Sequence, residues 1–385
     1  MNKWARRLAA LFLLCAGLLF LPGCWDYEAI NTRAPVTGLG IDPAQDDPNK
    51  FLITIQFPIL THTSQGQQGG NDGGGQSTEF QNLSVEAYSL PEALRAIQLR
   101  MYRKVDIAEL RAAIINENLS GDRMDSLIAQ LMRLPEVNRL ALVLTTPTSA
   151  KDVLSVNGLP NTPADFIDKA FKIRQEGFVV NRELWQYWRD TTQVGVVPMI
   201  PVVTVVPNED ESGSRLQFGG MKVYKGNAPV FDLDKQQTFY VNLLTEQARS
   251  MAIDLPLQDG LVSLTDIRSR HKMKCVVRGN SLVLVDHVTL ASTLGKVADP
   301  RPKPWPPTQL NELEAETSQY MTKQAIAVMK ELQQRQTDVF GFGRLYFQRH
   351  PEQEQKMKAE WGQMFEHAKV DIQVTVSITN KGMLI

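Results

Sequence analysis

Cysteine is scarce in this chain, whose 385 residues contain three of them, Cys15, Cys24 and Cys275. The first two lie in or directly after an N-terminal leader described below, so Cys275 is left without an intramolecular partner, which excludes a disulfide framework. Cys275 lies in the strand-like stretch Met273–Val277, and the sequence offers it no plausible histidine partner. This context favours a buried, unreactive thiol over a catalytic nucleophile.

The sequence also lacks the residue spacings of common catalytic and metal-binding sites. Its five histidines are scattered, without a His-Glu-x-x-His or Cys/His zinc pattern. No Gly-x-Ser-x-Gly nucleophile turn occurs, and the glycine-rich stretch 64–77 is not followed by the Lys-Ser or Lys-Thr pair of a phosphate-binding loop. Paired carboxylates such as Asp46 and Asp47 lie in hydrophilic loops, which is typical of solvated charge. We therefore expect no catalytic residue, no metal and no cofactor, and we interpret 64–77 as a flexible surface loop.

Neither sign of charge dominates, because the chain has 41 basic and 42 acidic residues. Removal of residues 1–23, which hold three basic side chains and no acidic ones, would lower the formal net charge from −1 to about −4. Nothing in the chain is basic enough to predict a nucleic-acid partner. The composition, 43% hydrophobic and 22% charged, is ordinary for a globular protein. Its length indicates more than one domain.

A single long apolar run occurs, Leu8–Leu21, and it follows a basic start. It is shorter than the roughly 20 residues that a membrane-spanning helix needs, and its length fits a signal peptide. The run ends in Leu21-Pro-Gly-Cys24, the pattern of a bacterial lipobox, in which diacylglycerol is attached to the cysteine thiol and cleavage before it requires a small residue. We predict that residues 1–23 are a cleaved signal peptide and that Cys24 carries diacylglycerol and a fatty acid such as palmitate. The alternatives are an ordinary secretory signal with a chance cysteine and an uncleaved anchor.

Strand and helix patterns alternate through the first half of the chain, which predicts an α/β or α+β domain. The expected strands are 34–42, 51–57, 110–115 and 140–145, and the expected helices are 89–100, 122–134 and 162–177. The aromatic stretch Leu184–Trp188 is interpreted as a core or subunit contact, with a ligand-stacking platform as the alternative. The proline-containing stretch Val194–Val206 is expected to be an edge strand or an extended connection.

The second half has a different pattern, and we place a linker at 208–216, between an N-terminal domain 24–207 and a C-terminal domain 217–385. A hairpin at 218–231 and strands near 261–269, 273–278 and 281–288 are expected to form a mostly antiparallel sheet. Thr308 is expected to cap the longest helix, and residues 370–378 alternate Val or Ile with polar residues, as a strand with one buried face does. The predicted fold class is α+β, with two or more mixed α/β subdomains and a C-terminal half in which a mostly antiparallel sheet packs with long helices.

The sequence Asp338-Val-Phe-Gly-Phe-Gly343 is expected to be a structural junction. Asp338 can cap the following helix through its side chain, while Gly341 and Gly343 permit close approach or tight backbone geometry. Phe340 and Phe342 are expected on different sides of that helix, with at least one in the core. The alternative is a surface that docks a partner.

Three stretches together resemble the Ger(x)C family, the C-subunit lipoproteins of bacterial spore germinant receptors. They are Gly23–Ile30 followed by Val36–Asp42, then Leu332–Phe347, and finally Trp361–Glu366 leading into strand 370–378. The order of elements matches along nearly the whole chain. One departure follows Pro351, where the family often has a tryptophan and this chain has Glu352–Gln355.

The resemblance implies a non-enzymatic lipoprotein subunit of a nutrient germinant receptor, in complex with the integral-membrane A and B subunits. It implies a position on the outer face of the bacterial cell membrane or the spore inner membrane, held in membrane lipid through Cys24. No catalytic residue transfers from the family. A membrane-anchored solute-binding lipoprotein that captures a small nutrient is the alternative. It would usually have two similar α/β lobes, whereas the two halves here differ, and a secreted hydrolase is disfavoured by the missing catalytic spacings.

Overall fold

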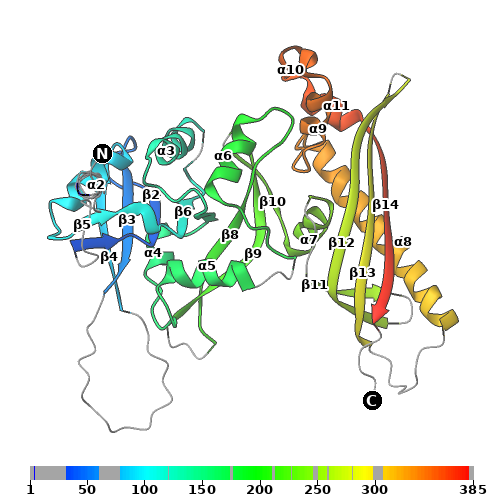
Figure 1. The fold of residues 1–385 in the computed structure, drawn as a ribbon, viewed down its shortest axis with the longest axis horizontal. Helices are drawn as coiled ribbons and strands as arrows, with labels where there is room; N and C mark the ends of the chain where they lie inside the picture. The colour runs from blue at the N-terminus through cyan, green and yellow to red at the C-terminus, as the bar shows by residue number, and fades with distance from the viewer. Residues whose placement is uncertain are drawn as a thin grey trace, which may run out of the picture.

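The computed structural model describes residues 4, 32–59, 79–119, 121–173, 177–209, 213–226, 228–245, 250–257, 260–279, 281–297 and 307–380. The predicted signal peptide apart from residue 4, Cys24 and the glycine-rich stretch 64–77 lie outside these residues, and the statements about them stay predictions. Two large β-sheets lie side by side, the N-terminal one at the left of Figure 1 and the C-terminal one at the right. The predicted α+β class is confirmed.

The first sheet has eight strands in the order β10-β9-β8-β7-β6-β2-β3-β4. Its middle strands β8, β7, β6 and β2 pair in parallel, and antiparallel strands extend the sheet at both ends. In chain order they are β2 (Gly38–Pro43), β3 (Phe51–Pro58), β4 (Phe80–Ala87), β6 (Ala112–Asn116), β7 (Leu142–Thr146), β8 (Met199–Pro207), β9 (Ser214–Lys225) and β10 (Ala228–Leu233). A separate parallel pair joins β1 (Arg33–Pro35) to β5 (Lys104–Asp106).

Helices pack against both faces of this sheet. Those packing on one face are α2 (Leu90–Gln98), α3 (Asp122–Arg133) and α6 (Leu184–Thr192), and those on the other are α4 (Ala150–Leu154) and α5 (Pro163–Ile173); a short 3-10 helix, Ile107–Glu109, follows β5. In β6, Ala113 and Ile115 join the core under the first group, while Ala112 and Ile114 join the core under the second. A strand covered on both faces buries every side chain, which is why β6 reads as an unbroken apolar run before Asn116.

The second sheet has four strands in the order β11-β12-β13-β14. They are β11 (Met251–Leu257), β12 (Gly260–Arg278), β13 (Ser281–Val297) and β14 (Lys369–Asn380). The first three strands pair antiparallel and β14 pairs in parallel with β13, so the predicted mostly antiparallel sheet is confirmed. The strands expected at 261–269 and 273–278 are one long strand, β12, with a register shift between Thr265 and Arg268.

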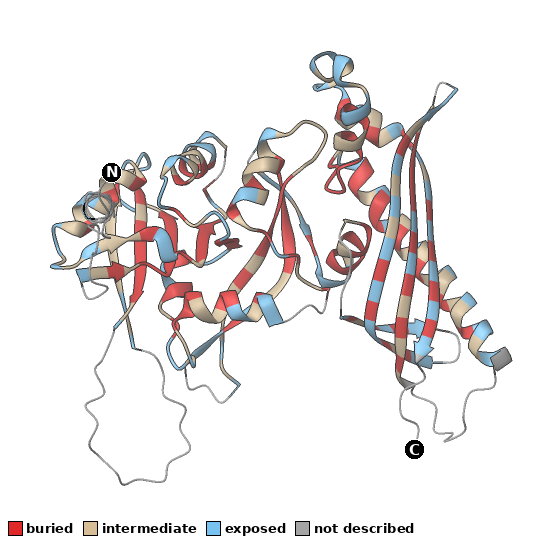
Figure 2. Ribbon diagram, in the orientation of Figure 1, coloured by how far each residue is buried: buried red, intermediate tan, exposed pale blue. Residues whose placement is uncertain are grey.

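Helices cover one face of the second sheet. They are α7 (Lys235–Thr245), α8 (Pro307–Gln334), α9 (Phe342–Arg349) and α11 (Trp361–His367), and the exposed helix α10 (Pro351–Met357) packs beside α9. Helix α8 runs along the sheet, and buried and exposed residues alternate along the strands beside it (Figure 2). Helix α7 lies between the two sheets, where Phe239 and Leu243 share one core with Met221 of β9. No helix among the described residues is long and apolar enough to cross a membrane.

The outer edge of β14 is closed by side chains of α8, spaced one turn apart. Three hydrogen bonds do this, from Val374 N to Thr322 Oγ1 (2.9 Å), from Val376 N to Ser318 Oγ (2.9 Å) and from Ile378 N to Glu314 Oε1 (2.6 Å). An unpaired edge strand exposes such N–H groups as a template for other chains. The polar residues on this side of α8 therefore protect the edge of the second sheet.

Two expectations for the middle of the chain are wrong. The hairpin at 218–231 forms as expected, but its strands β9 and β10 extend the first sheet through Leu233 and do not join the second. Strand β8 is no edge strand, because β9 and β7 flank it. Its prolines are tolerated on that side because its ladder with β7 consists of one residue pair, Thr145 with Val202, which leaves few ladder bonds to lose. The linker at 208–216 stays a prediction.

Candidate functional site

The carboxylate of Asp338 lies at the centre of the motif that the sequence singled out. The residue is 1% exposed, and its side chain accepts four hydrogen bonds. Oδ1 accepts from Gly341 N (2.8 Å) and Phe342 N (3.2 Å), and Oδ2 accepts from Gly343 N (2.8 Å) and Trp361 Nε1 (3.1 Å). Three of these donors are the first backbone N–H groups around the start of α9, which have no partner within a helix. The predicted capping role of Asp338 is therefore confirmed by the geometry.

Burial and hydrogen bonding act in opposite directions on this carboxyl group. Removal from water raises the pKa of Asp338, and the bonds from Gly343, Gly341, Phe342 and Trp361 lower it. Burial is the larger effect, and the pKa of Asp338 is raised to about 6. The donors offset only part of the free energy that burying a carboxylate costs.

Gly343 of α9 is in close backbone contact with Gly195, in the loop that leads into β8 of the first sheet. An added Cβ at Gly343 would lie 2.5 Å from Gly195 Cα, and one at Gly195 would lie 2.4 Å from the Gly343 carbonyl carbon. Gly195 precedes β8 of the first sheet and has a φ of +80°, a conformation that favours glycine. The contact is held by main-chain bonds from Arg344 N to Gly195 O (2.9 Å) and from Val197 N to Asp338 O (2.8 Å). The motif is thus a junction between a loop of the first sheet and the helices of the second.

The remaining residues of the motif are packed inside the protein. Gly341 has a φ of +82° and directly precedes α9. Phe340 and Phe342 are both buried, with ring centroids 6.2 Å apart. The expectation that at least one would lie in the core is confirmed, although Phe340 precedes the helix and is not part of it.

Trp361 closes the junction from the C-terminal side. Its ring stacks on Tyr346 at 5.8 Å and meets Phe347 edge-on at 5.5 Å, in addition to its bond to Asp338. Sequence reasoning noted Trp361 within a family-like stretch and did not link it to Asp338. It assigned no role to Gly195, for which the only signal was a glycine inside an apolar run. We name the set Gly195, Asp338, Gly341, Gly343 and Trp361 the Asp338 junction.

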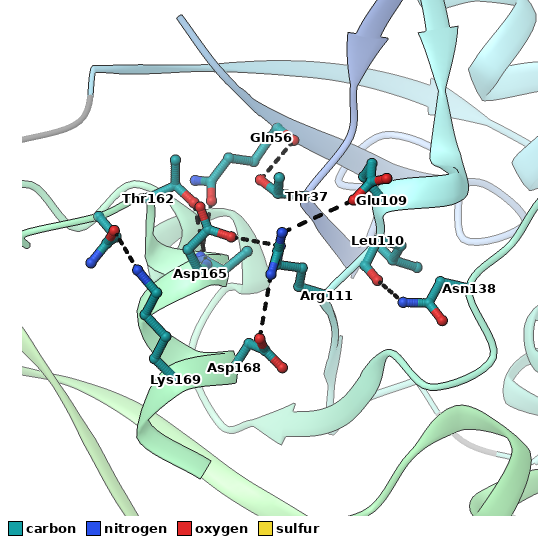
Figure 3. A network of polar contacts seen from close by, with 12 residues as sticks. Thr37, Gln56, Glu109, Leu110, Arg111, Asn138, Thr162, Asp165, Asp168 and Lys169 are labelled. Atoms are coloured by element: carbon teal, nitrogen blue, oxygen red, sulfur yellow. Dashed lines mark hydrogen bonds and ion pairs between the residues drawn. The ribbon is translucent and has the colours of Figure 1, made fainter. Parts of the chain in front are cut away.

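A second polar network lies on the α5 side of the first sheet (Figure 3). Arg111, just before β6, forms ion pairs with Asp165 (2.9 Å) and Asp168 (3.6 Å) of α5 and with Glu109 (4.0 Å). Gln56 of β3 accepts a hydrogen bond from Ala164 N through Oε1 (3.0 Å). These contacts fix the start of α5 against the sheet, and the charges of the network are partnered within the chain.

Asp42 repeats the arrangement of Asp338 at the end of β2. It is buried, and it accepts from Ala150 N (2.7 Å), Lys151 N (3.0 Å), Ser149 Oγ (3.1 Å) and Asn116 Nδ2 (3.0 Å). The donors Ala150 and Lys151 begin α4, so Asp42 caps that helix and ties it to the sheet. Both carboxylates serve a helix start of the chain itself.

The other residues weighed from the sequence fall into packing roles or outside the described range. Cys275 is buried, and burial raises the pKa of its thiol to about 12, which agrees with an unreactive cysteine. In the aromatic helix, Leu184 and Tyr187 lie in the core, whereas Trp185 is 37% exposed, so the core interpretation holds for part of that stretch. Among the described residues, no three metal-ligating side chains form a group. Cys24, the one predicted modification site, lies outside them.

Comparisons with known proteins match both halves of the chain. The family model for the "Spore germination protein N-terminal domain" matches residues 26–205, and "Spore germination B3/ GerAC like, C-terminal" matches residues 219–382. In Bacillus subtilis (strain 168), "Putative spore germination protein YfkR" is 23% identical over 100% of this chain and 98% of its own length, and "Spore germination protein KC" is 23% identical over 98% and 96%. The crystal structure of the GerBC protein has the same fold, with a TM-score of 0.55 and 17% identity over 89% of this chain and 97% of that one.

Proposed function

The chain belongs to the GerAC-like family of spore germination proteins, and on that premise we propose that it is the lipoprotein subunit of a nutrient germinant receptor. In this role it assembles with the integral-membrane A and B subunits of the receptor and is needed to trigger germination. The observation that carries the proposal is the match of both family models, which together span most of the chain from residue 26 to residue 382.

We place the subunit on the outer face of the cell membrane or the spore inner membrane, held there by lipid on Cys24. Support comes from the basic start, the apolar run Leu8–Leu21 and the Leu21–Cys24 lipobox. Two or more acyl chains hold a protein on a bilayer stably, whereas one chain does so only marginally.

The role that we propose is binding and assembly, without catalysis. Two buried carboxylates, Asp42 and Asp338, each accept four hydrogen bonds from the chain itself. A general base has to reach the proton that it removes from a substrate, and neither of these groups does. The remaining thiol, Cys275, is buried with a raised pKa.

Purification of the tagged, lipidated chain from detergent-solubilised membranes of cells that express the whole receptor tests the proposal. Both integral-membrane subunits should co-purify with it, and spores without the chain should lose the response to the nutrients of that receptor. If the chain purifies alone and binds a small nutrient by itself, it is a solute-binding lipoprotein, the alternative that the sequence left open.

A further inference from the structure

An exposed loop between α2 and β5 combines apolar and basic side chains. It has the sequence Leu99-Arg-Met-Tyr-Arg-Lys104 and is called here the 99–104 loop. Leu99 and Tyr102 are each 90% exposed, the highest values among the large apolar side chains of the described residues. Basic residues stand directly beside both of them. Apolar and aromatic side chains that project among cations are typical of segments that lie in a membrane interface.

The loop and the neighbouring strands β3 and β4 line a cavity of about 230 Å³. Its apolar lining includes Phe57, Leu83 and Met101, and Arg100 and Arg103 contribute its positive charge. Arg100 Nη1 donates to a main-chain oxygen, that of Ser84 (3.3 Å), and the Arg103 guanidinium lies over the ring of Tyr102 (5.3 Å). No carboxylate among the described residues forms an ion pair with either arginine.

The carboxylate of Asp106, close to the loop in the sequence, already has hydrogen-bond partners elsewhere. Asp106, two residues beyond the loop, accepts from Arg33 Nη1 (2.9 Å) with Oδ2 and from Ala108 N (3.0 Å) with Oδ1. The charge of Arg100 and Arg103 is therefore available to an anion from outside the chain. An apolar lining beside two guanidinium groups matches the chemistry of a phospholipid, which carries an anionic phosphate and hydrocarbon chains in one molecule.

The fold places this loop close to the predicted lipid anchor. Strand β5, which begins at Lys104, pairs in parallel with β1, and the register sets Lys104 opposite Arg33. Arg33 is nine residues beyond Cys24 in the sequence, and nine residues span at most about 30 Å when fully extended. A lipid on Cys24 would therefore keep Arg33 within about 30 Å of the bilayer surface, and Lys104, across the strand pair, within about 35 Å.

We propose that the 99–104 loop is the membrane-docking surface of the lipidated chain. Leu99 and Tyr102 enter the headgroup region, and Arg100 and Arg103 bind the phosphates of anionic lipids at the mouth of the cavity. The inference rests on the lipidation of Cys24 in the proposed function. The lipid on Cys24 and the 99–104 loop would together fix the orientation of the protein on the bilayer. The lipid makes docking of the loop favourable because it gives the loop a high effective concentration at the bilayer.

The test uses the full lipidated chain on vesicles, after its mass has shown the acyl chains. The variant Tyr102→Cys is labelled with an environment-sensitive fluorophore, and it has one accessible thiol because Cys24 is acylated and Cys275 is buried. On vesicles that contain phosphatidylglycerol, the label should shift to the blue and resist quenching by iodide. The matched control is Leu140→Cys, at a 62% exposed site on the segment before β7, which should stay open to iodide.

The charges of the loop are tested with Arg100→Gln and Arg103→Gln together. Each basic side chain near an anionic membrane favours binding, so the equilibrium constant for docking of the loop should be about 30-fold lower in this double variant than in the wild type. Arg100→Lys with Arg103→Lys should retain the dependence on anionic lipid, which separates loss of charge from loss of fold.

Three results would overturn the inference. One is equal quenching at positions 102 and 140 on anionic vesicles by a chain whose mass shows the acyl groups, and in that case the lipidated-subunit proposal would survive. Another is protection of position 102 only when the integral-membrane subunits are present, because the surface would then dock a protein. The third is absence of the acyl mass, which would remove the premise and refute the proposed lipidation as well.

Discussion

Replacing Gly343 with alanine should destabilise the protein strongly, because the new methyl group has no space. An added Cβ would lie 2.4 Å from Trp361 Cε2 and 2.5 Å from Gly195 Cα. Neither neighbour can move without breaking another contact, since the Trp361 indole donates to Asp338 (3.1 Å) and the Gly195 carbonyl accepts from Arg344 N (2.9 Å).

Overpacking a well-filled site costs 1–3 kcal/mol, and this site is at the upper end because a hydrogen bond is lost as well. We expect the free energy of unfolding to fall by about 3 kcal/mol. For domains of about 150–250 residues, each kcal/mol lowers the melting temperature by about 2–4 °C. The expected change is therefore a decrease of about 6–12 °C.

The assay is thermal unfolding of the purified chain, followed by circular dichroism. Gly362→Ala is the matched control, because Gly362 is in α11 directly after Trp361 and an added Cβ would meet the Gln336 side chain at 3.2 Å. That contact requires only a small shift, and alanine favours a helix over glycine, so this variant should melt within a few degrees of the wild type. A Gly343→Ala protein that melts normally but no longer co-purifies with the membrane subunits would refute the reasoning and make the motif a docking surface.

Three further predictions follow from the same residues and from the sequence. The folded pKa of Asp338, about 6 against an ordinary 3.8, means that this group contributes stability below pH 3.8 that is lost as the pH rises through 6. In urea unfolding, the stability of the wild type relative to Asp338→Asn should fall by about 2 kcal/mol between pH 4 and pH 7, and a constant difference would contradict the raised pKa. Cys24→Ala should release the chain from membranes, as cell fractionation would show. Retention of this variant, together with a wild-type mass that shows no acyl chains, would exclude the lipid anchor. Deletion of residues 66–75 should leave the melting temperature nearly unchanged, because loop length costs little closure entropy; a large decrease would mean that the stretch packs against the protein.

Local sequence patterns predicted most elements of this fold. The alternating residues 370–378 lie in β14, and the helix expected at 122–134 is α3, Asp122–Arg133. In both cases the signal is a periodicity of apolar residues against one core, which is contained within the segment itself. The hairpin at 218–231 also formed where glycine and asparagine mark a turn.

The pairing of distant segments was not predictable in the same way. Strands β9 and β10 join the first sheet because β9 pairs with β8, and the parallel pairing of β8 with β7 joins residues far apart in the chain. Nothing within residues 218–231 specifies the sheet to which the hairpin belongs. The proline rule misplaced β8 for a related reason, since it restricts ladder bonds and β8 makes few of them with β7.

The Asp338 junction divides in the same way into a local part and a distant part. The cap of Asp338 on Gly341, Phe342 and Gly343 spans at most five residues, and the Asp-x-x-Gly-x-Gly spacing indicated it. The contacts with Gly195 and Trp361 depend on tertiary packing, and they explain why Gly343 has to be glycine. A glycine without positive φ, in a helix where alanine would be favoured, indicates a close approach whose partner the sequence does not name.

Asp42 and Asp338 show why a buried carboxylate can be structural in a chain of this kind. Each is buried, and the free energy cost of burial is offset in part by main-chain N–H groups at a helix start and by one or two side-chain donors. Asp42 acts within the first sheet and α4. Asp338 differs because its donor Gly343 also touches Gly195, so its carboxylate supports both the start of α9 and the contact between α9 and the loop before β8. Loss of that carboxylate should therefore loosen the second sheet and its attachment to the first, and a partner that binds either half would be affected through this one junction.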